Sequence, residues 1–256
     1  MYCIDLNSDL GESFGSYKIG MDELVIGHVS SINAACGFHA SDPQVMEKTV
    51  AMAKAHNIRI GAHPGLPDLV GFGRRTMEVS FEETKAMVLY QIGALAAFCK
   101  VQGVELQHVK PHGALYNMAA QDKRLAEAIC EAIAEYDSNL IVMGLAGSEM
   151  IVTAKEKGLK VACEIFSDRA YEEDGSLVNR RKEGAVIHDE EVAIYRMVRA
   201  VKEGKIEAIT GKLIDVDAQS ICVHGDGEKA VKFTQRIRAA LEAEGVKICS
   251  LSEVLK

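Results

Sequence analysis

Short apolar runs alternate with amphipathic stretches along the chain. A strand is predicted wherever a run of about four to eight mostly apolar residues ends in polar or turn-forming residues. The runs that fit this description cover residues 3–7, 29–34, 58–62, 106–109, 140–145, 159–166 and 220–223, with a weaker one at 208–210. Because strands alternate with helices, the pattern predicts an α/β fold with a parallel sheet and helices outside it.

The helices predicted between these strands carry recognisable end signals. They cover about 42–57, 80–102, 122–136, 148–157, 190–202 and 227–245. Asp42 followed by Pro43 is typical of a helix start. Ser80 with Glu83 forms a capping box, and Gly103 is expected to end the same helix.

Most of the predicted strands end in residue types that do chemistry. The polar ends are Asn7-Ser8-Asp9, Asn33, His63, Lys110-Pro111-His112, Asp168-Arg169 and His224-Gly225-Asp226. Parallel strands bring such ends to one rim, which is where enzymes built on α/β barrels have their sites. With no linker or fixed-period repeat, the sequence predicts one (β/α) barrel domain over 1–256 and a single site at that rim.

Composition narrows the class of protein. The chain is 48% hydrophobic and 26% charged, which is typical of a globular protein. Its formal net charge of -8 argues against a nucleic-acid-binding surface, which needs clustered Lys and Arg. The N-terminal segment does not resemble an export signal, and the apolar runs are too short to span a bilayer. We therefore expect a cytoplasmic protein.

The cysteines are dispersed and form no Cys-x-x-Cys pair. An odd set of this kind, at positions 3, 36, 99, 130, 163, 222 and 249, predicts reduced and mostly buried thiols. Cys36 lies three residues before His39, which allows either a nucleophile with its base or a thiol packed beside glycine. The packed thiol is the commoner case.

Each candidate on the first three strands has a structural alternative. Asp9 suits a general base or metal ligand with Glu12 as a second carboxylate, or else a helix cap with a solvated glutamate. His63 suits an acidic substrate or a metal, or a histidine satisfied by backbone. Arg74 and Arg75 suit a carboxylate or phosphate clamp, or an exposed pair without function. The further polar residues expected to line the same pocket are Asn7, Asn33 and His39.

The polar residues at the ends of the later strands indicate a functional role more strongly than those on the first three strands. Lys110 and His112 are two residues apart, so both are expected to face the rim, and a lysine there is costly without a role. Pro-His-Gly is expected to keep the next helix from starting at once. His224 and Asp226 flank a glycine that permits close approach of a ligand. Asp168-Arg169 is either part of the site or a structural ion pair.

Several common motifs are missing. The chain contains no phosphate-binding P-loop, no dinucleotide fingerprint and no Gly-x-Ser-x-Gly elbow, so a self-contained nucleotide cradle of these kinds is absent. Its histidines also lack the short spacing typical of zinc sites. Residues 172–184 are polar and without periodicity, which predicts a mobile loop or lid.

Six segments in order make the chain resemble the LamB/YcsF family. They read IDLNSDLGESFG, SSINAACGFHASDP, IGAHPGLPDLVGFGRR, HVKPHGALYN, EIFSDRAYEEDGSLVNRR and ICVHGDG. The resemblance implies a distorted (β/α) barrel of the glycoside hydrolase/deacetylase type. It also implies a catalytic subunit that cleaves 5-oxo-L-proline to L-glutamate with ATP hydrolysis, sharing ATP with two partner subunits, B and C.

For that reaction, Asp9 is expected to be the general base. Lys110 and His112 are expected to stabilise developing negative charge or protonate the departing nitrogen, and an arginine (Arg74, Arg75 or Arg169) to hold the substrate carboxylate or a phosphate. General acid–base help of this kind contributes about 10²–10⁴-fold per group.

Two other functions stay open. The first is a stand-alone metal-dependent hydrolase or deacetylase acting on carbohydrate or acetylated substrates, with Asp9, His63 and His112 around a divalent cation. Leu10 weakens it, because it occupies the position of the second aspartate in such sites. So do the absence of Trp and an aromatic content of 5%, since sugar sites use aromatic faces. The second is a non-catalytic protein that binds a small molecule.

Overall fold

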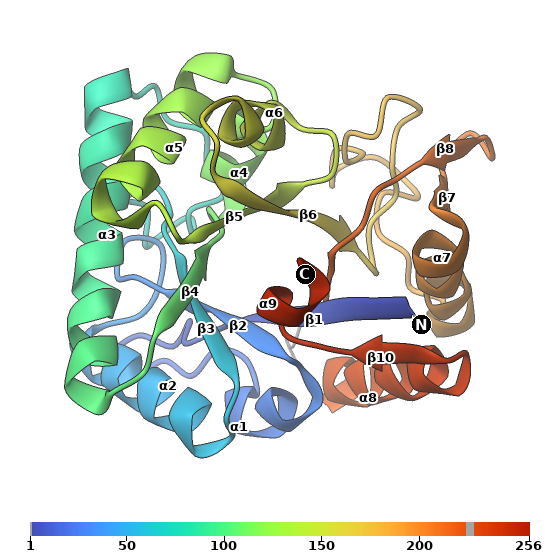
Figure 1. Cartoon of the computed structure of the whole chain (residues 1–256), viewed down its shortest axis with the longest axis horizontal. Coiled ribbons are helices and arrows are strands. Elements are labelled where there is room, and N and C mark those ends of the chain that lie inside the picture. Colours follow the sequence, from blue (N-terminus) through green and yellow to red (C-terminus); the bar gives the residue numbers. More distant parts are fainter. Residues whose placement is uncertain (1, 224–227) are drawn as a thin grey trace.

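Parallel strands close into a barrel at the centre of the molecule (Figure 1). The computed structural model describes residues 2–223 and 228–256, so the predictions for His224 and Asp226 lie outside its described residues. The ring runs β1 (Tyr2–Leu10), β2 (Ser31–Ala35), β3 (Arg59–His63), β4 (Leu106–Val109), β5 (Ile141–Leu145), β6 (Lys160–Phe166) and β9 (Ser220–Cys222). β9 pairs with both β6 and β1, which closes the ring and confirms the predicted distorted barrel.

Helices lie around the outside of this barrel, except for the last one, α9 (Leu251–Val254), which lies over the end of the ring beside β1 (Figure 1). The others are α1 (Asp22–Val25), α2 (Pro43–Ala55), α3 (Phe81–Gln102), α4 (Gly113–Ala119), α5 (Lys123–Asp137), α6 (Glu149–Glu156), α7 (Glu190–Glu203) and α8 (Glu228–Ala243), with a short 3₁₀ turn at Ile26–His28. The predicted caps are confirmed. Asp42 accepts from the backbone N–H groups of Gln44 and Val45, Ser80 and Glu83 form their capping box, and Gly103 ends α3 at φ 67°.

One local prediction is confirmed and another is wrong. The three non-helical residues Lys110-Pro111-His112 separate β4 from α4, which begins at Gly113 with His112 in extended conformation as its N-cap. The weak strand at 208–210 is instead a turn between β7 (Lys205–Glu207) and β8 (Leu213–Asp215), which pair antiparallel. Gly211, at φ 86°, makes that turn possible because a left-handed conformation favours glycine.

The inside of the barrel is polar, whereas its outside is apolar. Along β1, Ile4, Leu6 and Leu10 belong to the hydrophobic core, while Asp5 and Asn7 contact side chains of other strands across the ring. This alternation follows from the period of two in a strand. Because the interior contains charged groups, each of them needs a partner there.

Gly61 shows how tightly the polar interior is filled. His108 on β4 reaches past β3 to Asn33 on β2, with 2.8 Å between His108 Nε2 and Asn33 Oδ1. A Cβ at Gly61 on β3 would lie 2.1 Å from His108 Nε2. Only glycine leaves room for the imidazole at this level of the barrel.

β10 (Val246–Ile248) lies outside the ring, against the first residues of β1 (Figure 1). This pairing brings Cys3 to Cys249, which follows β10, and the two form a disulfide. The prediction of reduced thiols is therefore wrong for this pair. The other cysteines, 36, 99, 130, 163 and 222, are free and buried.

The polar segment 172–184 contains no helix or named strand, in agreement with its lack of periodicity. It is anchored within its length rather than only at its ends. Val178 is fully buried, its N–H donates to the Ala170 carbonyl, and its own carbonyl accepts from Arg169. No helix within residues 2–223 and 228–256 is long and apolar enough to cross a membrane.

Candidate functional site: a histidine cluster joined to a buried lysine

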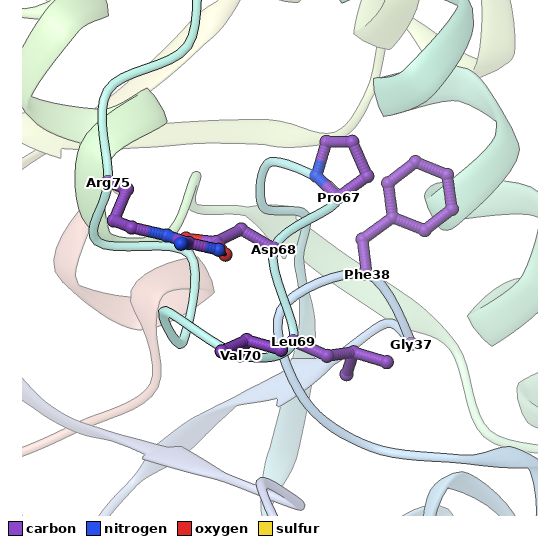
Figure 2. Close-up of a pocket in the computed structure, with 7 residues that line it drawn as sticks. All are labelled: Gly37, Phe38, Pro67, Asp68, Leu69, Val70 and Arg75. Atoms are coloured by element: carbon purple, nitrogen blue, oxygen red, sulfur yellow. Dashed lines mark hydrogen bonds and ion pairs between the residues drawn. The ribbon is translucent and has the colours of Figure 1, made fainter.

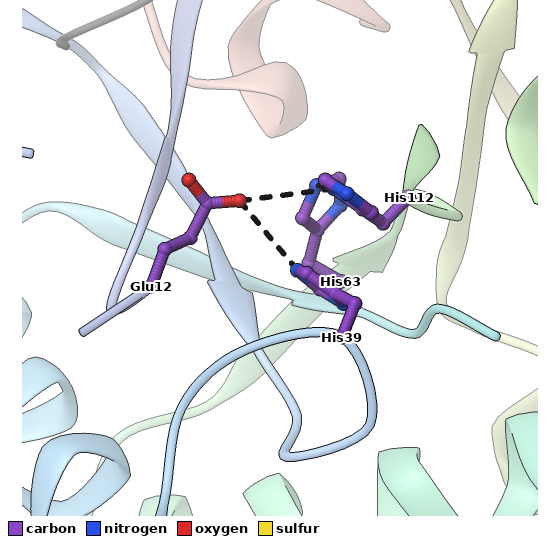
Figure 3. Close-up of side chains that lie close together, drawn as sticks. All are labelled: Glu12, His39, His63 and His112. Carbon is purple, nitrogen blue, oxygen red and sulfur yellow. Dashed lines mark hydrogen bonds and ion pairs between the residues drawn. The ribbon is translucent and has the colours of Figure 1, made fainter. Parts of the chain in front are cut away.

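Four buried side chains from separate loops and strand ends meet at the barrel rim (Figure 3). Glu12 follows β1, His39 lies between β2 and α2, His63 ends β3, and His112 caps α4. One potential ligand atom from each lies within 4.8 Å of the others. We call this set the histidine cluster. The sequence pattern predicted all four residues for one pocket, although the short spacing typical of zinc sites is absent.

Backbone carbonyls fix the orientation of two of these rings. His63 Nδ1 lies 2.7 Å from the Lys110 carbonyl oxygen, and His112 Nε2 lies 2.8 Å from the Phe72 carbonyl oxygen. A carbonyl only accepts, so each of these nitrogens carries the proton. The remaining nitrogens, His63 Nε2 and His112 Nδ1, then turn lone pairs toward each other at 3.0 Å. Such an arrangement calls for a positive charge between them.

The other two members complete the cluster. The ring of His39 stacks on that of His112, with 3.6 Å between centroids and an interplanar angle of 2°. Glu12 Oε1 lies 3.5 Å from His39 Nε2 and 3.7 Å from His112 Nδ1, as Figure 3 shows. Burial lowers the pKa of His112 to about 3, with His63 adding to the effect, and burial likewise lowers the pKa of His39.

A second group surrounds the ammonium of Lys110. Its Nζ lies 2.8 Å from Glu164 Oε1, 3.0 Å from Asp9 Oδ1, and 3.3 Å from both Asn7 Oδ1 and Cys222 Sγ. Burial alone would lower the pKa of Lys110, but Asp9, Cys222 and Glu164 raise it well above its ordinary value. The lysine is therefore charged at neutral pH. We call Lys110, Glu164, Asn7 and Tyr116 the lysine network.

Asp9 joins the two groups. Its Oδ1 accepts from Lys110 and, at 2.8 Å, from Asn33 Nδ2, while its Oδ2 lies 3.3 Å from His63 Nε2. Its side chain is 15% exposed, against 9% for Glu12 and 2% for Lys110. Of these two carboxylates, Asp9 is thus the more open to a molecule entering the rim.

Sequence reasoning missed several polar residues inside the barrel, among them three with large side chains. Glu164 on β6 has no exposed surface, and Tyr116 on α4 donates to its Oε2 at 2.8 Å. His108 is the third. Strand ends alone do not reveal them. Glu164 lies within the run CEIF and His108 within LQHV. A polar side chain inside an apolar run must be paired, so these two positions were the signal in the sequence that was overlooked.

Of the three predicted arginines, Arg75 and Arg169 are engaged by other groups, whereas Arg74 lies beside the histidine cluster. Arg75 pairs with Asp68 beside a shallow rim pocket (Figure 2) and lowers the pKa of Asp68 to about 2. The Arg74 guanidinium lies over the Phe72 ring, 5.1 Å from its centroid. Arg169 donates to the Val178 carbonyl. The backbone carbonyl of Asp168 accepts from Ile187.

Cys36 does not have the environment of a nucleophile. Its thiol is 2% exposed and lies 3.2 Å from the Ala34 carbonyl oxygen. Burial raises its pKa to about 12. Of the two interpretations, the structure supports the packed thiol, since a reactive cysteine needs thiolate character.

The LamB/YcsF family profile matches residues 4–256. The chain belongs to the LamB/YcsF family. It is 62% identical to the A subunit of 5-oxoprolinase from Clostridium beijerinckii, over 99% of this chain and 100% of the relative. It is 54% identical to the protein of the same name from Thermococcus sibiricus, over 99% of each.

One solved structure agrees with this assignment, and a more distant one shares the fold. The lactam utilization protein of Thermus thermophilus superposes with a TM-score of 0.92 at 46% identity, covering 96% of this chain and 99% of that one. A putative cellobiose-phosphate cleavage protein from Enterococcus faecalis superposes with a TM-score of 0.57 at 14% identity, covering 100% of this chain and 99% of that one. At such low identity the second likeness shows the fold alone.

Proposed function

We propose that the chain is the A subunit of an ATP-dependent 5-oxoprolinase and carries its hydrolytic site. The observation that carries this proposal is similarity over the whole length to relatives that bear the name of that 5-oxoprolinase component. The structure supports it with a carboxylate, Asp9, held at a barrel rim between a lysine and a histidine. Two partner subunits, B and C, complete the enzyme, and ATP is handled together with them.

The need for ATP follows from the substrate. The lactam of 5-oxoproline is a resonance-stabilised amide, so water attacks it slowly. Transfer of the ATP γ-phosphoryl group to the lactam oxygen makes the ring carbon electrophilic. Water then adds to that carbon, and the ring C–N bond breaks as the nitrogen takes up a proton, which leaves γ-glutamyl phosphate. A second water molecule hydrolyses this acyl phosphate and releases phosphate. The products are glutamate, ADP and phosphate.

In this scheme Asp9 takes the proton from the attacking water. Its Oδ1 is held by Lys110 and Asn33, so the carboxylate is fixed before the substrate arrives. Preorganised charge of this kind is a large contribution to catalysis. We assign both stabilisation of developing negative charge and protonation of the departing nitrogen to the Lys110 ammonium, which lies beside Asp9. Arg74, at the rim beside Gly113, is the arginine we assign to the substrate carboxylate.

We also infer that the histidine cluster holds a divalent cation. Its residues fit one: the facing lone pairs of His63 and His112 need positive charge, and each ring donates its other N–H to a backbone carbonyl, as metal-binding histidines do. Three imidazoles and a carboxylate suit zinc-like ions. When bound, such a cation polarises an oxygen atom or lowers the pKa of water.

The same cluster favours one alternative, a stand-alone metal-dependent hydrolase or deacetylase. That enzyme would need neither ATP nor partners. Leu10 still argues against it, because it supplies no second carboxylate beside Asp9.

One assay separates the two functions. Glutamate release from 5-oxoproline is measured with the chain alone, with subunits B and C, and with or without ATP, alongside acetate release from acetylated sugars. We expect glutamate only from the complete mixture with ATP. Release of acetate by the chain alone, without glutamate in any mixture, would support the alternative and sink the proposal.

A further inference from the structure

Glu164 is a fully buried carboxylate in the middle of β6 to which the sequence pattern assigned no role. We propose that Glu164 is a positioning residue that fixes the Lys110 ammonium against Asp9, acting through Lys110 rather than on the substrate. The kinetic part of this inference rests on the proposed function. Its structural part, the coupling between Glu164 and Lys110, does not.

Three donors occupy the two carboxylate oxygens of Glu164. Oε1 lies 2.8 Å from Lys110 Nζ and accepts from Asn7 Nδ2 at 2.9 Å, and Oε2 accepts from the Tyr116 hydroxyl at 2.8 Å. With no exposed surface, Glu164 is not placed to take a proton from a substrate. The geometry is that of a group that orients its neighbours.

Lys110 has few ways to move while Glu164 is present. Its ammonium has three N–H donors, and acceptors reach it from two strands: Glu164 on β6, and Asp9 with Asn7 on β1. Since the lysine side chain is flexible, a single partner would leave it several rotamers. A second carboxylate on another strand restricts it to the one in which Nζ also reaches Asp9.

Glu164 also orients Asn7. The amide nitrogen of Asn7 donates to Glu164 Oε1 and, at 2.7 Å, to Ser220 Oγ, which leaves Oδ1 to accept from Asn33 and Lys110. Asn33 in turn donates to Asp9. Both chains of contacts from Glu164, through Lys110 and through Asn7 and Asn33, therefore end at Asp9 Oδ1.

Stability alone does not explain these charges. Replacing a buried ion pair with apolar residues of similar volume is often neutral or stabilising, whereas removing one partner is strongly destabilising. Lys110 between two carboxylates is thus a costly way to fill a barrel. A positioning role accounts for it.

A double-mutant cycle tests the proposal in the complete enzyme with both partner subunits. We expect Glu164→Gln, which keeps shape but removes charge, to lower kcat about 10- to 100-fold with KM within about twofold, because misplacement by about 1 Å costs about 100-fold. In a Lys110→Met background, Glu164→Gln should change kcat less than about twofold further. The control is Glu207→Gln, an exposed glutamate on β7, which should behave as wild type.

The wild type, the two single variants and the double variant give a second readout by thermal unfolding. Lys110→Met leaves two carboxylates facing each other, so it should lower Tm, and adding Glu164→Gln should restore part of that loss. Additive changes in both kcat and Tm would overturn the proposal. If the wild-type mixture releases no glutamate, the proposed function fails, and the Tm cycle alone still decides the coupling between Glu164 and Lys110.

Discussion

The histidine cluster and the lysine network lie at the same rim and are equally buried, yet their partners differ in kind. Backbone carbonyls hold His63 and His112, each through one nitrogen, and the second nitrogens face one another. Side chains from β1, β6 and β9 surround Lys110 with more acceptors than it has donors. The facing nitrogens of the histidine cluster can still bind a ligand, whereas every N–H donor of Lys110 has an acceptor.

This difference indicates that the histidine cluster is suited to bind a ligand, whereas the lysine network orients the residues beside it. Fixed rings with spare lone pairs are suited to a cation, because their orientation is set before it binds. A saturated lysine instead sets the charge and position of its neighbour. Asp9 contacts both groups, so it should be the most sensitive residue of the site.

The largest effect is expected at Asp9, which contacts both groups. Asp9→Ala should lower turnover by about 10²–10⁴-fold, because it removes the proposed general base. Lys110 keeps Glu164 as a partner, so the fold should persist. Steady-state glutamate release and circular dichroism on the same preparation check both statements. Turnover near wild type would remove Asp9 from the mechanism.

Next in size is the loss of a cluster histidine. His39→Ala removes a ligand that belongs to the cluster but not to the lysine network, so it should weaken zinc or cobalt binding at least about 10-fold. Titration calorimetry with the metal alone measures this without any activity. The matched control is His56→Ala, an exposed histidine next to α2. Equal affinities for the two variants would contradict the inferred metal site.

A substitution in the barrel interior tests how tightly the polar side is packed. Gly61→Ala places a methyl group 2.1 Å from His108 Nε2, so it should destabilise the protein by about 1–3 kcal/mol. Gly93→Ala on α3, where a Cβ meets nothing within 4 Å, is the control and should not destabilise. Denaturant unfolding of the three proteins provides the comparison. An unchanged midpoint for Gly61→Ala would mean that His108 lies elsewhere.

The smallest effect concerns Asp5, which reaches Asn7 of the lysine network through Ser220. Burial raises its pKa from 3.8 to about 6. The folded state thus binds the proton more tightly than the unfolded state, so this group adds stability as the pH falls. Between pH 7 and pH 5 the gain should be about 1 kcal/mol. Asp5→Asn should lack this gain in stability. The free energy of unfolding of the wild type and of the variant, measured at both pH values, checks this. The same pH dependence in both proteins would contradict the assignment.

The sequence predicted the parts of the molecule that depend on local pattern. The strand ends at His63 and Lys110 and the cap at Ser80 follow from periodicity and capping, which act over a few residues. Glu164 and the bond between Cys3 and Cys249 were missed, because they depend on which strands become neighbours across the barrel. Long-range pairing of this kind leaves no local signal beyond a charged residue inside an apolar run.

The most direct test follows isotopically labelled 5-oxoproline by NMR in a mixture of this chain, subunits B and C, and ATP. We expect one glutamate formed per ADP with the wild-type chain and essentially none with Asp9→Ala. Equal rates for the two proteins, or glutamate formed without this chain, would contradict the claim that Asp9 lies at the reacting centre.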